Sequence, residues 1–181
     1  MSLDLDHVGI AVHDLDAAAA QFRRLGFRLT DRGFHTLPPP APGAARPRVG
    51  TGNHCAMLAR GYVELIGITD AAYTGRLRAA LARYQGVHIV AFGTADAQAA
   101  ARDLRAAGIA ATGPAILERP VEEDGQSALA RFSIVDWPPD LLPDCYFFII
   151  QHLTRALLWP SPLPEHPNGA ASLEGITVAV G

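Results

Sequence analysis

Residues 5–27, LDHVGIAVHDLDAAAAQFRRLGF, carry the pattern that decides the fold, and residues 86–109, GVHIVAFGTADAQAAARDLRAAGI, repeat it. Each copy begins with β-branched residues alternating with other types, which is typical of a strand, and continues with an alanine-rich stretch typical of a helix. An aspartate suited to cap the helix and a glycine suited to end it stand at the same spacing in both copies: Asp14 and Gly26, then Asp96 and Gly108. The repeat predicts an internal duplication in which each half opens with a strand and a helix.

Each helix is followed by segments typical of three further strands. The expected strands are 27–34, 53–59 and 62–68 in the first half, and 115–119, 128–136 and 146–152 in the second. A helical segment at 74–84 joins the halves, and the proline-rich stretch 36–50 must be a loop. We therefore expect two βαβββ modules, residues 1–70 and 71–152, followed by an extension over 153–181.

The composition excludes several classes of protein. The chain is 49% hydrophobic and 18% charged with net charge −3, which suits a globular core and not a disordered chain. Its 15 basic residues are all arginine and form no run, so nucleic-acid binding is not expected. The two cysteines exclude a disulfide framework, the acidic start is unlike a signal peptide, and no apolar run is long enough to span a membrane. These features predict a cytoplasmic protein without nucleic-acid or membrane partners.

Several segments in order resemble the glyoxalase-like domain family of the vicinal-oxygen-chelate superfamily. They are DHVGIAV, DLDAAAAQFRRLGF, GTGN, GYVELIGI, FFIIQHLTRALLW and HPNGA, and together they span nearly the whole chain. The resemblance implies an α+β fold in which two βαβββ modules form an open half-barrel cavity of the glyoxalase/bleomycin-resistance type. It also implies that the cavity often holds one divalent metal, with ligands from the first and last strands of each module.

In the first module, the residues that match the implied metal ligands are His7 and Glu64. His7 has the small neighbours Gly9 and Ala11 on its strand face, which leaves room for a ligand. The alternative is a histidine near a strand start that merely forms a hydrogen bond to a neighbouring loop. Glu64 interrupts the apolar run YVELIGI, where an unpaired buried carboxylate would be unfavourable, so it must have a partner. The alternative is that Glu64 lies at the edge of the sheet and its side chain points to water.

In the second module, the expected ligands are His88 and Gln151. Gln151 stands where the superfamily usually has glutamate, which keeps an oxygen donor but loses a charge. His88 is one residue out of register with His7, so it is either realigned by a bulge or a simple strand histidine. His152 neighbours Gln151 and must point to the opposite face, so only one of them reaches the cavity. We expect Glu64 and His152 to be the catalytic pair.

Three residues are candidates for substrate binding. Asn53, in GTGN, can bind substrate or satisfy backbone groups at a strand entry. Arg46 and Arg48 in the long loop can clamp a carboxylate or merely keep an apolar segment soluble.

The resulting function hypotheses belong to two classes. The first is a metal-dependent lyase, isomerase or dioxygenase that acts on a small oxygenated substrate with one Zn, Ni, Mn or Fe ion. The alternative is a metal-free protein of the bleomycin-resistance type that binds or sequesters a small molecule. The closing segment LEGITVAV, residues 173–180, resembles the first strand of a third module, and we expect it to pair with another strand, which in a second copy would give a homodimer.

Overall fold

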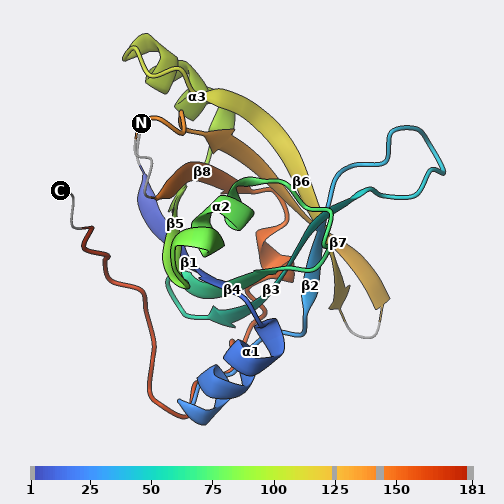
Figure 1. The fold of residues 1–181 in the computed structure, drawn as a ribbon, viewed down its shortest axis with the longest axis vertical. Helices are drawn as coiled ribbons and strands as arrows, with labels where there is room; N and C mark the ends of the chain where they lie inside the picture. Colours follow the sequence, from blue (N-terminus) through green and yellow to red (C-terminus); the bar gives the residue numbers. More distant parts are fainter. Residues whose placement is uncertain (1–2, 124–125, 142–144, 179–181) are drawn as a thin grey trace.

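The computed structural model describes residues 3–123, 126–141 and 145–178 (Figure 1). The first module contains β1 (Asp4–Val12), α1 (Leu15–Arg24), β2 (Gly33–Thr36), β3 (Arg48–Met57) and β4 (Tyr62–Ile68). The second contains α2 (Arg76–Arg83), β5 (Gly86–Gly93), α3 (Ala97–Ala106), β6 (Thr112–Glu123), β7 (Gln126–Asp136) and β8 (Tyr146–His152). A short 3-10 helix, η1 (Arg155–Leu157), follows.

The strands close into one barrel in the order β1-β4-β3-β2-β6-β7-β8-β5. In each module the first strand lies parallel to the last, β1 beside β4 and β5 beside β8, and the two modules meet where β1 and β5 pair antiparallel. At the far side, β2 and β6 pair at Thr36 and Glu118. This mixed sheet with its helices confirms the predicted α+β fold of two βαβββ modules.

The duplicated aspartates begin the two equivalent helices. Asp14 accepts a hydrogen bond from the amide of Ala17, and Asp96 accepts one from the amide of Ala99, both at 2.9 Å. Such caps satisfy an amide that would otherwise have no partner in the first helical turn. The apolar faces of α1 and α3 pack on the outside of the barrel against Leu65 and Ile149 respectively.

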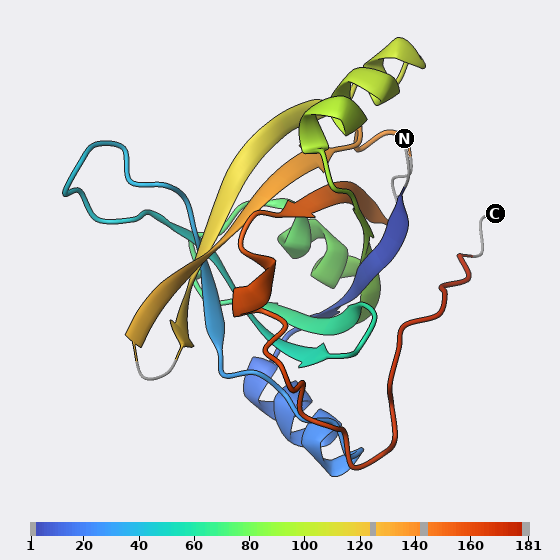
Figure 2. The same cartoon turned by 180° about the vertical axis from the view of Figure 1, so that it is seen from behind.

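The two ends of the barrel are covered by different segments. Helix α2 lies across one end, and η1 lies near the opposite end, as the two views show (Figures 1 and 2). At the η1 end, the Trp159 ring packs edge-on against Tyr62 and His152, and its indole nitrogen donates to the carbonyl of Leu58 at 3.0 Å. Trp159 thus packs against the interior side chains at the η1 end of the barrel.

Two predicted strands differ from the structure. Residues 27–32 are not a strand: the Arg28 amide donates to His166 Nδ1, and the Thr30 side chain accepts from the Cys55 amide through its Oγ1. Residues 173–178 are also outside any strand; an isolated bridge between Ser172 and Arg60 precedes them, and the Leu173 amide donates to the Arg60 carbonyl at 2.9 Å. Residues 179 and 180 of the expected strand lie outside the described residues.

In the described part of the chain, no helix combines the length and the apolar character needed to cross a membrane.

Candidate functional site

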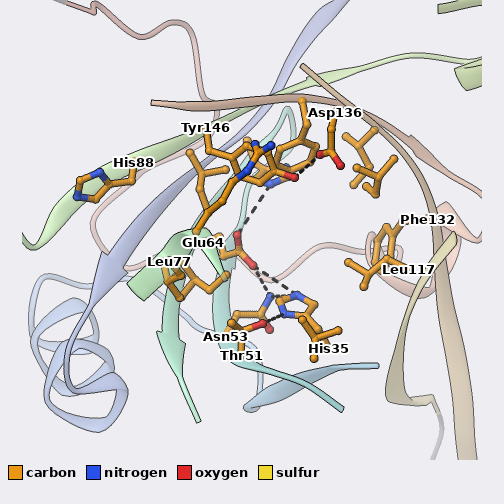
Figure 3. Close-up of a pocket in the computed structure, with 18 of the residues that line it drawn as sticks. His35, Thr51, Asn53, Glu64, Leu77, His88, Leu117, Phe132, Asp136 and Tyr146 are labelled. Atoms are coloured by element: carbon orange, nitrogen blue, oxygen red, sulfur yellow. Dashed lines mark hydrogen bonds and ion pairs between the residues drawn. The ribbon is translucent and has the colours of Figure 1, made fainter. Parts of the chain in front are cut away.

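A cavity of about 620 Å³ occupies the interior of the barrel at the α2 end. Its wall is polar on one side, where it is lined by His7, His35, Thr51, Asn53, Glu64 and Arg119. The rest of the lining is mainly apolar and includes Leu77, Ile89, Phe132, Ile134, Phe148 and Ile150. The hydrogen-bonded pair Tyr146 and Asp136 also lines the cavity (Figure 3). The cavity thus suits a small molecule with one polar end and an apolar body.

Glu64 lies at the centre of the polar side. Strand alternation turns Tyr62, Glu64 and Ile66 into the barrel, and Glu64 is only 6% exposed. The Asn53 side-chain amide donates to Glu64 Oε1 at 2.5 Å. The partner that the sequence required for this buried carboxylate is therefore an amide of the neighbouring strand, which leaves Oε2 without a hydrogen bond to Asn53.

Two imidazoles flank the Glu64 carboxylate. His7 Nε2 lies 3.9 Å from Oε2, and His35 Nε2 lies 3.8 Å from Oε1. A hydrogen bond of 3.0 Å joins His35 Nδ1 to Thr51 Oγ1. Burial lowers the pKa of His35, and the neighbouring Glu64 charge offsets this only in part, so the ring is neutral at neutral pH.

His7 is held from behind by Asp6. The His7 Nδ1–H donates to Asp6 Oδ1 at 2.7 Å, and the His152 Nε2–H donates to the same carboxylate at 3.0 Å. Neighbours in a regular strand point apart, but the β1–β5 pairing shifts register between Leu5 and His7, which brings Asp6 and His7 to one side. Burial raises the pKa of Asp6, but its bonds to the two imidazoles outweigh burial and leave the pKa well below the ordinary value.

This arrangement gives His152 a supporting position. Its ring faces the barrel interior among Tyr62, Phe132 and Trp159, beneath the cavity, and reaches the site only through Asp6. Orientation of His7 through Asp6 is the effect that this geometry allows His152 to have.

His88 and Gln151 are not brought to Glu64. His88 Nε2 binds the carbonyl of Tyr84 at 2.8 Å, its ring stacks on Tyr84, and it lies apart from Glu64 in Figure 3. Gln151 points to α3, where its side chain accepts from the Ala97 amide at 3.0 Å and donates to the Ala95 carbonyl at 2.8 Å.

The duplication explains this outcome. Counted from the capping aspartates Asp14 and Asp96, the counterpart of His7 is Ile89, not His88. Counted along the equal strands β4 and β8, the counterpart of Glu64 is Phe148. Both counterparts line the cavity, so the second module supplies apolar surface where the first supplies imidazole and carboxylate.

The residues do not fit the four-ligand metal centre that the family resemblance implies. His7 and Glu64 face each other, but their second-module counterparts carry no donor atom. Among the described residues, no group of three or more His, Cys, Asp or Glu side chains is placed to hold a metal ion. We therefore derive no step through a metal.

The three candidate substrate-binding residues lie in different places, and only Asn53 lines the cavity. Asn53 lines the cavity and binds Glu64. Arg46 instead forms an ion pair with the buried Glu118 carboxylate, and the Arg48 guanidinium lies over the Phe34 ring, 4.7 Å from its centroid. Both arginines thus have contacts outside the cavity.

His35, Asp6 and Arg119 were missed in the sequence. Arg119 on β6 is 5% exposed and lines the cavity, and its Nη1 donates to Asn53 Oδ1 at 2.9 Å. An arginine inside the segment ILERPV is the one local signal for it, because a central strand position is usually apolar.

The cavity also contains the Cys55 thiol, near Arg119 Nη1 at 3.9 Å. Burial raises its pKa to about 12, so it is protonated at neutral pH and is not a nucleophile. His54 points the other way, to the carbonyl of Thr30.

Comparison with known proteins agrees with this fold. The sequence matches the model of the glyoxalase-like domain over residues 5–181. The chain belongs to the glyoxalase-like domain family. A comparison with curated protein sequences finds no match to this glyoxalase-like protein.

Solved structures share the fold of this glyoxalase-like protein at low identity. A variant of methylmalonyl-CoA epimerase from Streptomyces coelicolor, in complex with 2-nitronate-propionyl-CoA, is 23% identical with a TM-score of 0.59 over 84% of this chain and 100% of that chain. The epimerase from Mycobacterium tuberculosis is 21% identical with a TM-score of 0.58, over 83% of this chain and 89% of that chain. A hypothetical protein from Staphylococcus aureus is 17% identical with a TM-score of 0.63, over 87% of this chain and 62% of that chain.

Proposed function

We propose that this glyoxalase-like protein is an enzyme of the isomerase or lyase type that transfers a proton on a small, largely apolar, oxygenated substrate. The observation that carries the proposal is the Glu64 carboxylate, which is buried in the cavity wall with one oxygen held by Asn53 and the other facing His7. A buried carboxylate fixed in this way is suited to act as a general base.

Each group then has a defined task. Asn53 orients the carboxylate, so that Glu64 Oε2 accepts the proton. His7 Nε2, 3.9 Å from that oxygen, is placed to exchange a proton with it or with the substrate, while Asp6 fixes the ring. The apolar side of the cavity binds the body of the substrate and excludes water, which strengthens the electrostatic interactions at the polar side.

The structural neighbours support the reaction class. They include methylmalonyl-CoA epimerases, one of them in complex with methylmalonyl-CoA and NH4+, and an epimerase is an isomerase that changes the configuration at one carbon. At about 23% identity this likeness supports the class of chemistry without naming the substrate.

A second candidate is a metal-free protein that binds or sequesters a small molecule. The observation in its favour is the apolar replacement of both second-module ligand positions by Ile89 and Phe148. For either function, a homodimer and a cytoplasmic location remain predictions.

The experiment measures hydrogen exchange at carbon. Each compound is incubated with the protein in D2O, and NMR records how fast the signal of its carbon-bound proton disappears. The compounds are methylmalonyl-CoA, simpler 2-methyl-branched thioesters and 2-hydroxy ketones. For a compound that the wild type exchanges, Glu64→Gln should slow the exchange at least about 100-fold, because the amide accepts no proton. The matched control is Glu174→Gln at an exposed glutamate outside the cavity.

Exchange by Glu64→Gln at the wild-type rate would contradict the proposed role of Glu64. Tight binding of a compound in calorimetry, with no exchange of any compound, would favour the sequestering protein instead.

A further inference from the structure

Arg119 is a buried cation with few partners. It is 5% exposed, and its Nη1 contacts the Asn53 side-chain oxygen and, more distantly, the Cys55 sulfur. Its Nε is buried without a hydrogen-bond partner among the described residues. A buried guanidinium whose protein hydrogen bonds are incomplete is unfavourable unless another polar group satisfies it. Arg119 also lines the cavity, so a ligand oxygen can bind the part of its side chain that the cavity exposes.

The position of Arg119 relates it to Glu64. The Asn53 amide lies between them: its oxygen accepts from Arg119 Nη1 at 2.9 Å, and its nitrogen donates to Glu64 Oε1 at 2.5 Å. The cation and the carboxylate are thus one side-chain amide apart in the same wall. In a carbonyl compound, the oxygen and the proton on the adjacent carbon are separated in a similar way. With one hydrogen-bond distance added at each end, the oxygen can lie at Arg119 while the proton lies at Glu64.

We propose that Arg119 binds the carbonyl oxygen of the substrate, which makes the substrate a ketone, aldehyde or thioester with an acidic C–H next to the carbonyl. This inference rests on the proposed function of Glu64. Glu64 takes the proton from that carbon, the C–H electrons form the C=C bond of an enolate, and the carbonyl oxygen takes the negative charge beside Arg119. Return of the proton from Glu64 to the same carbon and face restores the substrate. Where that carbon carries a hydroxyl, Glu64 can instead deliver the proton to the former carbonyl carbon while the hydroxyl proton passes to the oxygen beside Arg119, which gives the isomeric carbonyl compound, so no other reactant is needed.

The surroundings favour this assignment. A fixed cation acts most strongly on a developing oxyanion where water is excluded, and Arg119 is the deeply buried arginine of the cavity wall. Arg76 and Arg83 also line the cavity, but they stand exposed on α2 at its mouth. In this chain the protein's own cation thus occupies the polar side, while Ile89 and Phe148 stand at the second-module positions that correspond to His7 and Glu64.

The first test measures the rate of carbon-bound hydrogen exchange in D2O for Arg119→Gln and Arg119→Lys. The control is Arg48→Gln, which replaces an arginine outside the cavity. Removing one preorganised oxyanion donor lowers kcat by about 10²–10³ in known enzymes, and we expect Arg119→Gln to fall in that range. Arg119→Lys keeps the charge but loses the planar fork, so it should be intermediate. Added guanidinium chloride at millimolar concentration should partly restore Arg119→Gln and leave Glu64→Gln inactive.

The second test is independent of turnover. The test ligand is 2-methylpropanoate, a branched apolar carboxylate, and its affinity is measured by NMR titration. Arg119→Gln should weaken binding at least about tenfold, and Glu64→Gln should preserve or tighten it, because a like charge is removed. Equal affinity of the wild type and Arg119→Gln would overturn the role of Arg119, even if Glu64→Gln abolishes exchange. Absence of exchange by the wild type would overturn the proposed function, whereas the titration would still decide the role of Arg119.

A second variant keeps the inference testable if Arg119→Gln does not fold. A Cβ at Gly33 would lie 2.6 Å from Arg119 Cδ and 2.7 Å from Asn53 Oδ1, so Gly33→Ala must displace this pair while keeping the guanidinium. Folded Gly33→Ala, checked by circular dichroism, should weaken 2-methylpropanoate binding. Unchanged binding together with unchanged exchange would contradict the assignment.

Discussion

At the scale of single residues, the site depends on a carboxylate, Asp6, that is not among the residues lining the cavity. Asp6 accepts hydrogen bonds from His7 and His152 at once, and both rings are buried. A histidine whose Nδ1 is bound by a carboxylate presents a defined Nε2, which here faces Glu64. The alternation of a strand predicts the opposite direction for Asp6, and only the register shift in β1 brings it inside. A bulge depends on both paired strands, so the sequence of β1 did not reveal this residue.

Asp6→Asn should lower the free energy of unfolding by about 3 kcal/mol at pH 7, because it leaves two buried imidazoles without an ionised acceptor. The pKa of Asp6 is lowered in the folded protein, so its stabilisation is fully present above the unfolded value near 4. That stabilisation is lost as the pH falls through the lower folded pKa. Urea unfolding at pH 7 and pH 3 should therefore show a smaller difference between wild type and variant at pH 3. The control is Asp4→Asn, an exposed aspartate of the same strand; a difference that grows at pH 3 would contradict the assignment.

At the scale of elements, equivalent strands have diverged in polarity. Strand β4 brings Tyr62 and Glu64 into the barrel, whereas β8 brings Tyr146 and Phe148 at the same places. The expected ligand Gln151 corresponds to Gly67 of β4, which faces α1 through Leu15. Aligning the two modules on equivalent residues, such as the capping aspartates and the starts of the last strands, is possible from the sequence alone. It shows that Gln151 and His88 are not the counterparts of Glu64 and His7. The strand and helix pattern was predictable because alternation and capping are local, whereas residues 27–32 and 173–178 depend on distant partners.

The contact between β1 and β5 joins the modules and requires a glycine. A Cβ at Gly9 would lie 2.7 Å from the Cβ of Ile89, which cannot move without its strand. Gly9→Ala should therefore destabilise the fold by about 2 kcal/mol, as overpacking of a core does. Thermal and urea unfolding measure the effect against Gly175→Ala, whose added Cβ meets no described atom within 4 Å. Equal stability of the two variants would show that β1 and β5 tolerate a wider separation.

At the scale of the whole molecule, one barrel combines a polar module and an apolar one. The first module supplies the imidazoles, the amide and the carboxylate, and β6 of the second adds Arg119. The other interior strands of the second module form a mainly apolar wall for the body of a ligand, with His88, Asp136 and Tyr146 also in the lining. The family resemblance predicted the barrel and the facing of His7 and Glu64, but a resemblance cannot show which half of a duplicated site has been replaced.

We propose that proton transfer in this cavity requires Glu64 and is performed by the chain's own side chains. The deciding measurement uses wild type, Gln151→Ala and Glu64→Gln, each dialysed exhaustively against EDTA. It is the rate at which each protein incorporates deuterium into a compound that the wild type exchanges. Wild type and Gln151→Ala should retain equal rates, and Glu64→Gln should lose at least about 100-fold. Exchange by Glu64→Gln at the wild-type rate would contradict the role of Glu64. Loss of wild-type exchange after EDTA treatment, with recovery on addition of metal, would contradict proton transfer by the chain's own side chains.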